Sequence, residues 1–222
     1  MTHAEDGAVE HHIEVSRTAR YWTLGPEDAD DVWFVLHGYK QLARRFLRRF
    51  VAIDDGSRYV VAPEALSRFY VGTEQGRHGA ESVVGGTWMT REDRLHEIRD
   101  YVAYLDRLHD TVGAGGRRLT VLGFSQGVAT ATRWVALGAA RPARLVLWGD
   151  FTPPDLDLPR ARTALAGVDV IMVRGAGDRA LTSPLAEEEG ARLEAAGIGH
   201  RTVVYDGGHD IDEETLRALA AP

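Results

Sequence analysis

Hydrophobic positions along the chain follow two periods, one typical of strands and one typical of helices. Continuous apolar runs rich in β-branched residues predict strands buried on both faces of a sheet. These runs cover residues 32–36, 59–62, 119–123, 145–148, 168–173 and 202–205. Two further strands are expected near the N-terminus, at 12–16 and 19–24.

Helices are expected between these strands. The clearest is 91–112, where apolar residues recur at three- and four-residue steps, with Thr90 as its expected N-cap and Gly113 at its end. Further helices are expected at 126–137, 184–196 and 211–220. The stretch 42–50 alternates arginines with apolar residues, which indicates an amphipathic helix with its arginines in water.

Strands and helices alternate over the whole length, and no internal repeat or linker-like segment divides the chain. This order is typical of the α/β class, in which a mostly parallel sheet carries helices on both faces. We therefore expect a single domain over residues 1–222. The least regular part is 63–89, which is expected to be a long loop at a carboxyl end of the sheet.

Composition narrows the possible chemistry. The chain has no cysteine, which excludes disulfides, thiolate nucleophiles and cysteine-bound metals. The net charge of −7 argues against nucleic acid as a partner. No apolar run approaches the roughly 20 residues of a membrane-spanning helix, so we expect a cytoplasmic protein without stable membrane insertion.

The strongest motif is Gly-Phe-Ser-Gln-Gly at 123–127, a G-x-S-x-G sequence between an apolar strand and a helical run. In this context the serine sits on a strained turn that presents its hydroxyl, and flanking glycines leave room for the neighbouring strand and helix. Ser125 is therefore the candidate nucleophile. The amide of Gln126, the next residue, would face a developing oxyanion.

A serine nucleophile needs a histidine base and an acid behind it. His209 follows the strand 202–205 and precedes the last helix, which places it where a base can reach Ser125. The remaining histidines considered are expected to be solvated, on the helix 91–112 or near the N-terminus: His3, His11, His12, His96 and His109. Asp178, after the strand 168–173, is the first choice for the acid, and Asp150, after the strand 145–148, is the alternative.

Two further loops, each after a buried strand, carry sequence patterns that could belong to a site. His37-Gly38-Tyr39 follows the strand 32–36, so the Tyr39 amide is the candidate second oxyanion donor, and His37 is expected to shape the loop. The stretch 175–180 also satisfies the dinucleotide pattern G-x-G-x-x-A. A phosphate-binding loop should open directly into a helix, whereas Pro184 places the helix start later, so a nucleotide-binding role is not expected.

These motifs resemble those of the phospholipase/carboxylesterase family of α/β-hydrolases, which includes acyl-protein thioesterases and small bacterial carboxylesterases. The resemblance runs from residue 32 onward and is carried by Leu-His-Gly at 36–38, Gly-Phe-Ser-Gln-Gly at 123–127, Gly-Asp at 177–178 and Gly-His at 208–209. It implies the α/β-hydrolase fold without a large lid domain, a triad of Ser125, Asp178 and His209, and oxyanion donors at Tyr39 and Gln126. It also implies no metal or organic cofactor.

The resemblance implies hydrolysis of small-molecule carboxylic esters, with short to medium acyl chains, through an acyl-enzyme. The chain departs from the thioesterase pattern at Tyr-Lys-Gln, 39–41, and residues 66–89 are similar to a bacterial predicted-esterase subgroup, so depalmitoylation of proteins is not expected. Thioesterase or lysophospholipase activity, a ligand-sensing role without catalysis, and a homodimer all stay open. Four side chains are candidates for an acyl pocket, with core packing as the alternative: Phe69, Tyr70, Trp88 and Met89.

Overall fold

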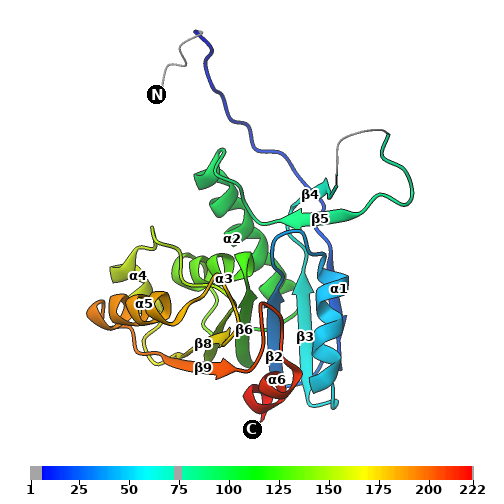
Figure 1. Cartoon of the computed structure of the whole chain (residues 1–222). Helices are drawn as coiled ribbons and strands as arrows, with labels where there is room; N and C mark the ends of the chain where they lie inside the picture. Colours follow the sequence, from blue (N-terminus) through cyan, green and yellow to red (C-terminus); the bar gives the residue numbers. More distant parts are fainter. Residues whose placement is uncertain (1–6, 73–76, 222) are drawn as a thin grey trace.

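A seven-stranded sheet forms the centre of the computed structural model, which describes residues 7–72 and 77–221 (Figure 1). Its strand order is β1-β3-β2-β6-β7-β8-β9, and only β1 runs antiparallel to its neighbour. The strands are β1 (Tyr21–Leu24), β2 (Asp31–Leu36), β3 (Arg58–Pro63), β6 (Arg118–Phe124), β7 (Arg144–Trp148), β8 (Asp169–Gly175) and β9 (Arg201–Tyr205).

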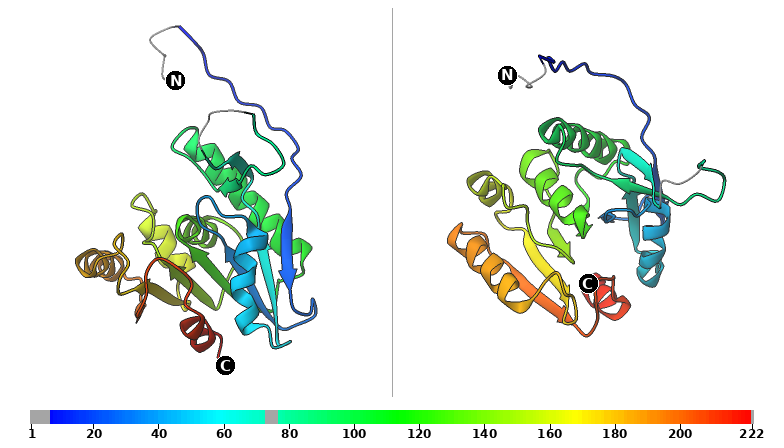
Figure 2. Two further views of the ribbon diagram at one scale, coloured as in Figure 1. Left: turned by 45° about the vertical axis from the view of Figure 1, so that its right-hand side comes forward. Right: turned by 45° about the horizontal axis from the view of Figure 1, so that its top comes forward.

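Helices cover both faces of this sheet, as expected (Figure 2). One face packs against α2 (Arg94–Thr111), α3 (Gln126–Leu137), α4 (Leu158–Ala164) and α5 (Ser183–Ala195). The other packs against α1 (Ala43–Leu47), the 3-10 helix η1 (Arg48–Ile53) and α6 (Glu213–Ala220). Alternate residues of β2 serve the two layers, since Phe34 packs on the first side and Trp33 on the second.

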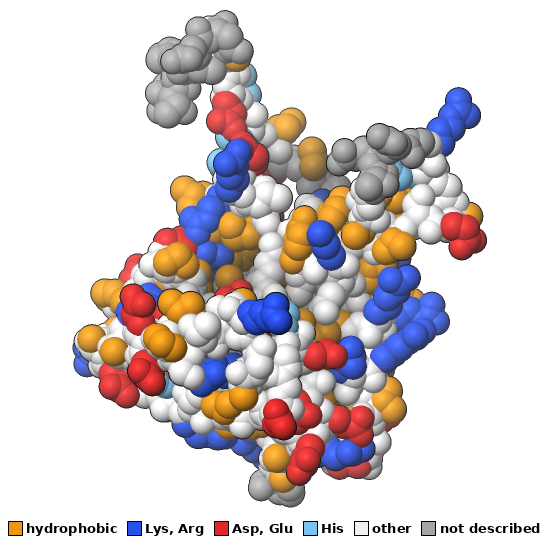
Figure 3. Space-filling model, in the orientation of Figure 1, with side chains coloured by type: hydrophobic (Ala, Val, Ile, Leu, Met, Phe, Trp, Pro, Cys, Tyr) orange, Lys and Arg blue, Asp and Glu red, His pale blue; other side chains and the backbone are white. Residues whose placement is uncertain are grey.

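The expected helix at 42–50 is confirmed as α1 followed by η1. Phe46 and Phe50 are buried, whereas Arg44 and Arg48 are exposed. On the face drawn in Figure 3, basic and acidic side chains are interspersed. None of the described helices is both long and apolar enough to cross a membrane.

Three expectations about elements were wrong. Residues 12–16 form no strand; they lie in an extended N-terminal segment that pairs with no strand of the sheet. The helix expected from residue 91 begins at Arg94, with Asp93 rather than Thr90 at its N-cap. The stretch 63–89 contains a two-stranded hairpin, β4 (Ser67–Tyr70) with β5 (Val84–Thr87), because these short antiparallel segments pair with each other outside the main sheet.

Candidate active site

Ser125 occupies the turn between β6 and α3 in a conformation that side chains rarely adopt. Its φ is 52° and its ψ is −124°, which for a residue with a Cβ stores backbone strain. The turn fits only because the residues two positions before and after Ser125 are glycines. A Cβ on Gly127 would lie 2.2 Å from the Leu36 carbonyl oxygen, and one on Gly123 would lie 2.3 Å from the Gly127 carbonyl oxygen.

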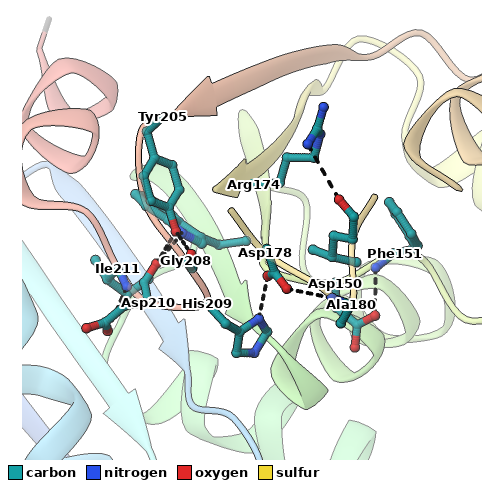
Figure 4. Close-up of polar contacts among 12 residues, drawn as sticks. Asp150, Phe151, Arg174, Asp178, Ala180, Tyr205, Gly208, His209, Asp210 and Ile211 are labelled. Carbon is teal, nitrogen blue, oxygen red and sulfur yellow. Dashed lines mark hydrogen bonds and ion pairs between the residues drawn. The ribbon is translucent and has the colours of Figure 1, made fainter. Parts of the chain in front are cut away.

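His209 and Asp178 meet at the carboxyl edge of the sheet (Figure 4). The Nδ1 of His209 lies 2.7 Å from Oδ2 of Asp178 and donates a hydrogen bond to it. The other carboxylate oxygen accepts a hydrogen bond of 3.0 Å from the Ala180 amide. Asp178 is 6% exposed, whereas the His209 side chain is 40% exposed, so the acid is enclosed and the imidazole reaches the cleft. Nε2 of His209 has no hydrogen-bond partner among residues 7–72 and 77–221, so this nitrogen can take a proton.

The loop that carries His209 is held by two aromatic side chains that the sequence analysis did not single out. The Tyr205 hydroxyl lies 2.7 Å from the Gly208 carbonyl oxygen and 2.5 Å from that of Asp210, one on each side of His209. Trp148 donates from Nε1 to the Asp210 carbonyl oxygen at 2.9 Å. Trp148 ends β7 and Tyr205 ends β9, the two strands that flank β8, so the loop of His209 is fixed to the sheet.

Asp150, the alternative acid, lies close to His209 but is engaged elsewhere. Its Oδ1 accepts a hydrogen bond of 2.8 Å from the Phe151 amide. Among the described residues, no hydrogen bond joins the Asp150 carboxylate to the His209 imidazole. Burial raises the pKa of the Asp150 carboxyl, with the Phe151 amide and the charge of His209 acting in the opposite direction. The geometry therefore pairs His209 with Asp178.

The loop after β2 lies directly against the serine. A Cβ built on Gly38 would come within 3.1 Å of the Ser125 Cβ. Lys40, with φ of 65°, donates its amide to the Gly86 carbonyl oxygen at 3.0 Å, and the Gly86 amide returns a bond of 2.9 Å to Gln41. The hairpin strand β5 thus braces the loop that presents the Tyr39 amide, and this amide has no hydrogen-bond partner among residues 7–72 and 77–221.

His37 shapes this loop, as expected. It is fully buried; its Nδ1 lies 2.8 Å from the Gly38 carbonyl oxygen and donates to it. Its Nε2 accepts from the Ala65 amide at 3.1 Å, so both ring nitrogens are occupied. Burial lowers the pKa of His37, which keeps the imidazole neutral.

The Gln126 side chain makes contacts that the motif alone does not reveal. Its side-chain Nε2 donates to the Met89 carbonyl oxygen at 2.9 Å, and its Oε1 accepts from the Trp88 amide at 3.1 Å. The glutamine of the motif therefore ties the end of the hairpin to the nucleophile turn. It fixes Met89 at the cleft.

The serine opens into a cleft of about 940 Å³ that also contains Gln126, His209 and Met89. The other three acyl-pocket candidates lie outside its lining. Trp88 is a core residue whose Nε1 donates to the His37 carbonyl oxygen at 2.8 Å, in line with the packing alternative. Phe69 stacks on Tyr39 at 5.3 Å between ring centroids, and Tyr70 is exposed on β4.

The walls of the cleft come from segments that the sequence analysis did not assign to the site. They are the loop after β7 and the region before and within α5, with the apolar side chains Phe151, Pro153, Pro154, Leu181 and Leu185. Nothing in their periodicity distinguishes such residues from ordinary packing. Their role follows only from the topology that brings the two segments to the same edge.

Two ion-pair clusters frame these walls. Asp155 in the loop after β7 binds Arg133 of α3 at 2.7 Å and also pairs with Arg94 of α2. Glu189 of α5 accepts hydrogen bonds from the Thr152 amide at 3.1 Å and from Arg192 at 2.9 Å. The loop after β7 is therefore fastened to three helices.

The remaining sequence predictions lie away from this cleft. His11, His12 and His96 are exposed or half-buried, and His3 lies outside the described residues. His109 is not solvated as expected, because its side chain packs against the rings of Phe34 and Trp134 and is only 13% exposed. The dinucleotide-like stretch 175–180 does not open into a helix, since α5 begins at Ser183. Within the described residues, the only group of histidines and carboxylates arranged to hold a metal is His12, Asp93 and His96, outside the cleft lining.

Comparison with known proteins identifies the fold. No protein-family model and no curated sequence matches the chain. Among solved structures, acyl-protein thioesterase 2 of Zea mays is 16% identical with a TM-score of 0.69, over 91% of this chain and 96% of that chain. Esterase PE8 is 19% identical with a TM-score of 0.68, over 92% and 97%.

A third similar structure is the carboxylesterase of Bacillus cereus, 17% identical with a TM-score of 0.64 over 91% of this chain and 92% of that chain. These proteins span nearly the same length as this chain. The chain therefore has the α/β-hydrolase fold, as the motifs predicted.

Proposed function

We propose that this protein is a serine hydrolase that cleaves carboxylic esters through an acyl-enzyme, with Ser125 as nucleophile, His209 as base and Asp178 as the acid. The observation that carries the proposal is the 2.7 Å bond between His209 and Asp178, beside a serine in a strained strand-to-helix turn of the same cleft. The esterases and thioesterases with the same fold support it.

In the first half of the reaction, Nε2 of His209 takes the proton of Ser125 while the serine Oγ attacks the ester carbonyl carbon. The carbonyl oxygen becomes an oxyanion, which the Tyr39 and Gln126 amides would stabilise. The bond to the alcohol oxygen then breaks, and His209 returns its proton to the departing alcohol. The acyl group stays on Ser125.

In the second half, water replaces the alcohol. His209 takes a proton from the water, whose oxygen attacks the acyl carbon and forms a second oxyanion. The bond to the Ser125 oxygen breaks and the serine recovers its proton from His209. One ester and one water yield one carboxylic acid and one alcohol, so the protein ends unchanged and no cofactor is consumed.

The cleft supports an ester with a short to medium acyl chain. Its walls are mainly apolar and include Phe151 and Leu185. Glu189 also lines the cleft, and Asp155 pairs with Arg133 of the lining. An apolar wall favours an acyl group, because burying each methylene contributes about 0.8 kcal/mol. We place the acyl group against these walls and the alcohol toward solvent.

The test is hydrolysis of p-nitrophenyl esters from acetate to palmitate by the wild-type protein and by Ser125→Ala. The variant should lose about a million-fold in kcat, and Ser16→Ala, an exposed serine outside the cleft, should lose nothing. A loss of less than about tenfold in Ser125→Ala would overturn the assignment.

A fluorophosphonate probe separates the remaining alternatives. Labelling of Ser125 without turnover of any oxygen ester would direct the test to thioesters and lysophospholipids, which the same mechanism cleaves. Labelling without turnover of any of these would indicate a ligand-sensing protein. No labelling would remove the nucleophile assignment.

A further inference from the structure

A group of imidazoles and carboxylates joins the N-terminal segment to the first turn of α2, outside the lining of the serine cleft. His12 and Glu10 belong to the extended segment, whereas Asp93 caps α2 and His96 lies in its first turn. The rings of His12 and His96 are stacked, with centroids 4.0 Å apart. The proposed hydrolysis uses none of these side chains.

The imidazole nitrogens and carboxylate oxygens of this group lie close together. Oδ1 of Asp93 lies 3.2 Å from Nε2 of His12 and 2.5 Å from Nδ1 of His96. The same Nε2 of His12 lies 3.4 Å from Oε1 of Glu10. Each imidazole nitrogen carries at most one proton, so the single Nε2 cannot donate fully to both carboxylates. A cation between them would satisfy the ligand atoms of His12, Asp93 and His96 together, since these three atoms all lie within 4.8 Å of one another.

The spacing between the ligand atoms of His12 and Asp93 matches that of a four-coordinate metal. Zinc binds histidine nitrogen and carboxylate oxygen at about 2.0 to 2.2 Å, so neighbouring ligand atoms of a tetrahedron lie about 3.3 to 3.5 Å apart. The separation of 3.2 Å between Nε2 of His12 and Oδ1 of Asp93 is within about 0.1 Å of this range. On binding, the contact between His96 and Asp93 must widen and the two stacked rings must turn so that both nitrogens face the ion.

We propose that His12, Asp93 and His96 form a three-ligand site for a divalent transition-metal ion such as Zn²⁺, with water in the remaining coordination position. Imidazole nitrogen favours zinc and its neighbours over Mg²⁺ or Ca²⁺, which prefer sites made of oxygen alone. The Asp93 carboxylate offsets part of the charge of the ion and the weak repulsion from the N-terminus of α2. The ion would tie the N-terminal segment to the body of the protein.

The side-chain exposures fit a site that solvent can reach. They are 42% for His12, 43% for Asp93 and 36% for His96, so the ion can enter and leave without unfolding the chain. Residues 7–20 form no strand or helix that would otherwise fix them. Metal binding should therefore change the mobility of this segment more than the stability of the sheet.

The first experiment is calorimetric titration of the full chain with Zn²⁺, using wild type, His12→Ala, His96→Ala and His11→Ala. His11 is exposed and adjacent but outside the cluster, so it is the matched control. We expect one site per chain, at least tenfold weaker binding in His12→Ala and His96→Ala, and unchanged binding in His11→Ala. Equal affinities in all four proteins, or no saturable site in wild type, would overturn the proposal.

The second experiment tests whether the ion ties the N-terminal segment to the body of the protein. Trypsin can cleave after the exposed Arg17, between the cluster and β1. Zn²⁺ should slow this cleavage several-fold in wild type and in His11→Ala, and leave it unchanged in His12→Ala. Because His12 lies in a segment outside the sheet, its replacement does not threaten folding. Equal protection of wild type and His12→Ala would contradict the tether, and neither readout depends on ester hydrolysis.

Discussion

Asp178 and Asp150 follow neighbouring strands, β8 and β7, and both carboxylates lie near the imidazole that would act as the base. Only Asp178 is hydrogen-bonded to it, at 2.7 Å. Asp150 instead caps the start of its own loop through the Phe151 amide. The sequence offers both residues at strand ends, and a single hydrogen bond separates their roles.

We predict that Asp178→Asn lowers kcat for ester hydrolysis by about 10⁴-fold, because an asparagine amide would donate to Nδ1 of His209 and leave the proton on the wrong nitrogen. Asp150→Asn is the matched control and should cost less than tenfold. Initial rates on a p-nitrophenyl ester at saturating concentration give both values. A larger loss in Asp150→Asn than in Asp178→Asn would reverse the assignment.

His37 illustrates a histidine that serves the fold. Because burial lowers its pKa below the ordinary value of 6.5, the folded protein keeps it neutral while the unfolded chain takes up a proton as the pH falls below 6.5. Its contribution to stability is therefore present above pH 6.5 and lost as the pH falls below it.

We predict that the wild-type free energy of unfolding decreases more steeply with falling pH than that of His37→Gln, by at most about 1.4 kcal/mol per pH unit. Urea unfolding at pH 7.5 and 5.5 measures the difference. His11→Gln, which replaces an exposed histidine, should retain the wild-type dependence. Parallel pH dependences for wild type and His37→Gln would show that His37 can ionise in the fold.

At the scale of elements, the nucleophile turn depends on close contact between β2, β6 and α3. Gly127 faces the backbone of Leu36, and a Cβ there would lie 2.2 Å from the carbonyl oxygen and 2.8 Å from the carbonyl carbon. Backbone atoms in the centre of a sheet cannot move aside as a flexible side chain can. The glycine is therefore a requirement of packing.

We predict that Gly127→Ala destabilises the protein by at least about 3 kcal/mol, at the upper end of overpacking effects, because backbone must shift. Gly115→Ala is the control, since its Cβ would meet only the His109 ring at 4.0 Å. Urea unfolding followed by tryptophan fluorescence compares the two variants. A urea midpoint of Gly127→Ala close to that of wild type would contradict this prediction, because it would mean that the turn can accommodate a Cβ.

The main-sheet strands after β1 and the helix α3 could be predicted from sequence because their apolar runs are long and bounded by clear turns. The hairpin β4–β5 could not, since Gly85 and Gly86 on β5 carry no hydrophobic pattern. The β5 glycines instead allow close contact with the loop after β2, since a Cβ on Gly85 would lie 2.6 Å from the Lys40 carbonyl oxygen. Helix α4 was missed because two turns hold too few apolar positions to show a period.

The residues of the candidate site also fall into those that could be predicted from sequence and those that could not. Ser125, His209 and Asp178 could be predicted because each follows a recognisable strand in a set chain order. The cleft walls could not, because Arg133 and Arg192 look like solvent-facing positions of helices until the loop after β7 covers them. Side chains whose function depends on what another segment places beside them leave no local signal.

Across the whole molecule, Asp155 connects three parts of the structure that surround the cleft: α2 through Arg94, α3 through Arg133 and the loop after β7 in which it lies. Hydrogen bonds from Arg94 and Arg133 lower the pKa of the Asp155 carboxyl from 3.8 to about 2, against the effect of burial. This carboxylate therefore stabilises the folded state above about pH 4, and its contribution is lost as the pH falls through about 2.

We predict that Asp155→Asn lowers the free energy of unfolding at pH 7 by about 1 to 3 kcal/mol. The expected decrease is smaller than that for a fully buried ion pair that loses one partner, because the Asp155 side chain is 42% exposed. A decrease remains because Arg133 is left buried without its charge partner. The deficit should shrink as the pH falls from 4 toward 2, where wild type also loses the charge. Urea unfolding at pH 7, 4 and 2.5 measures it, with Asp28→Asn, an exposed aspartate, as control. A deficit that stays constant over this range would mean that Asp155 stabilises the cleft by packing rather than by charge.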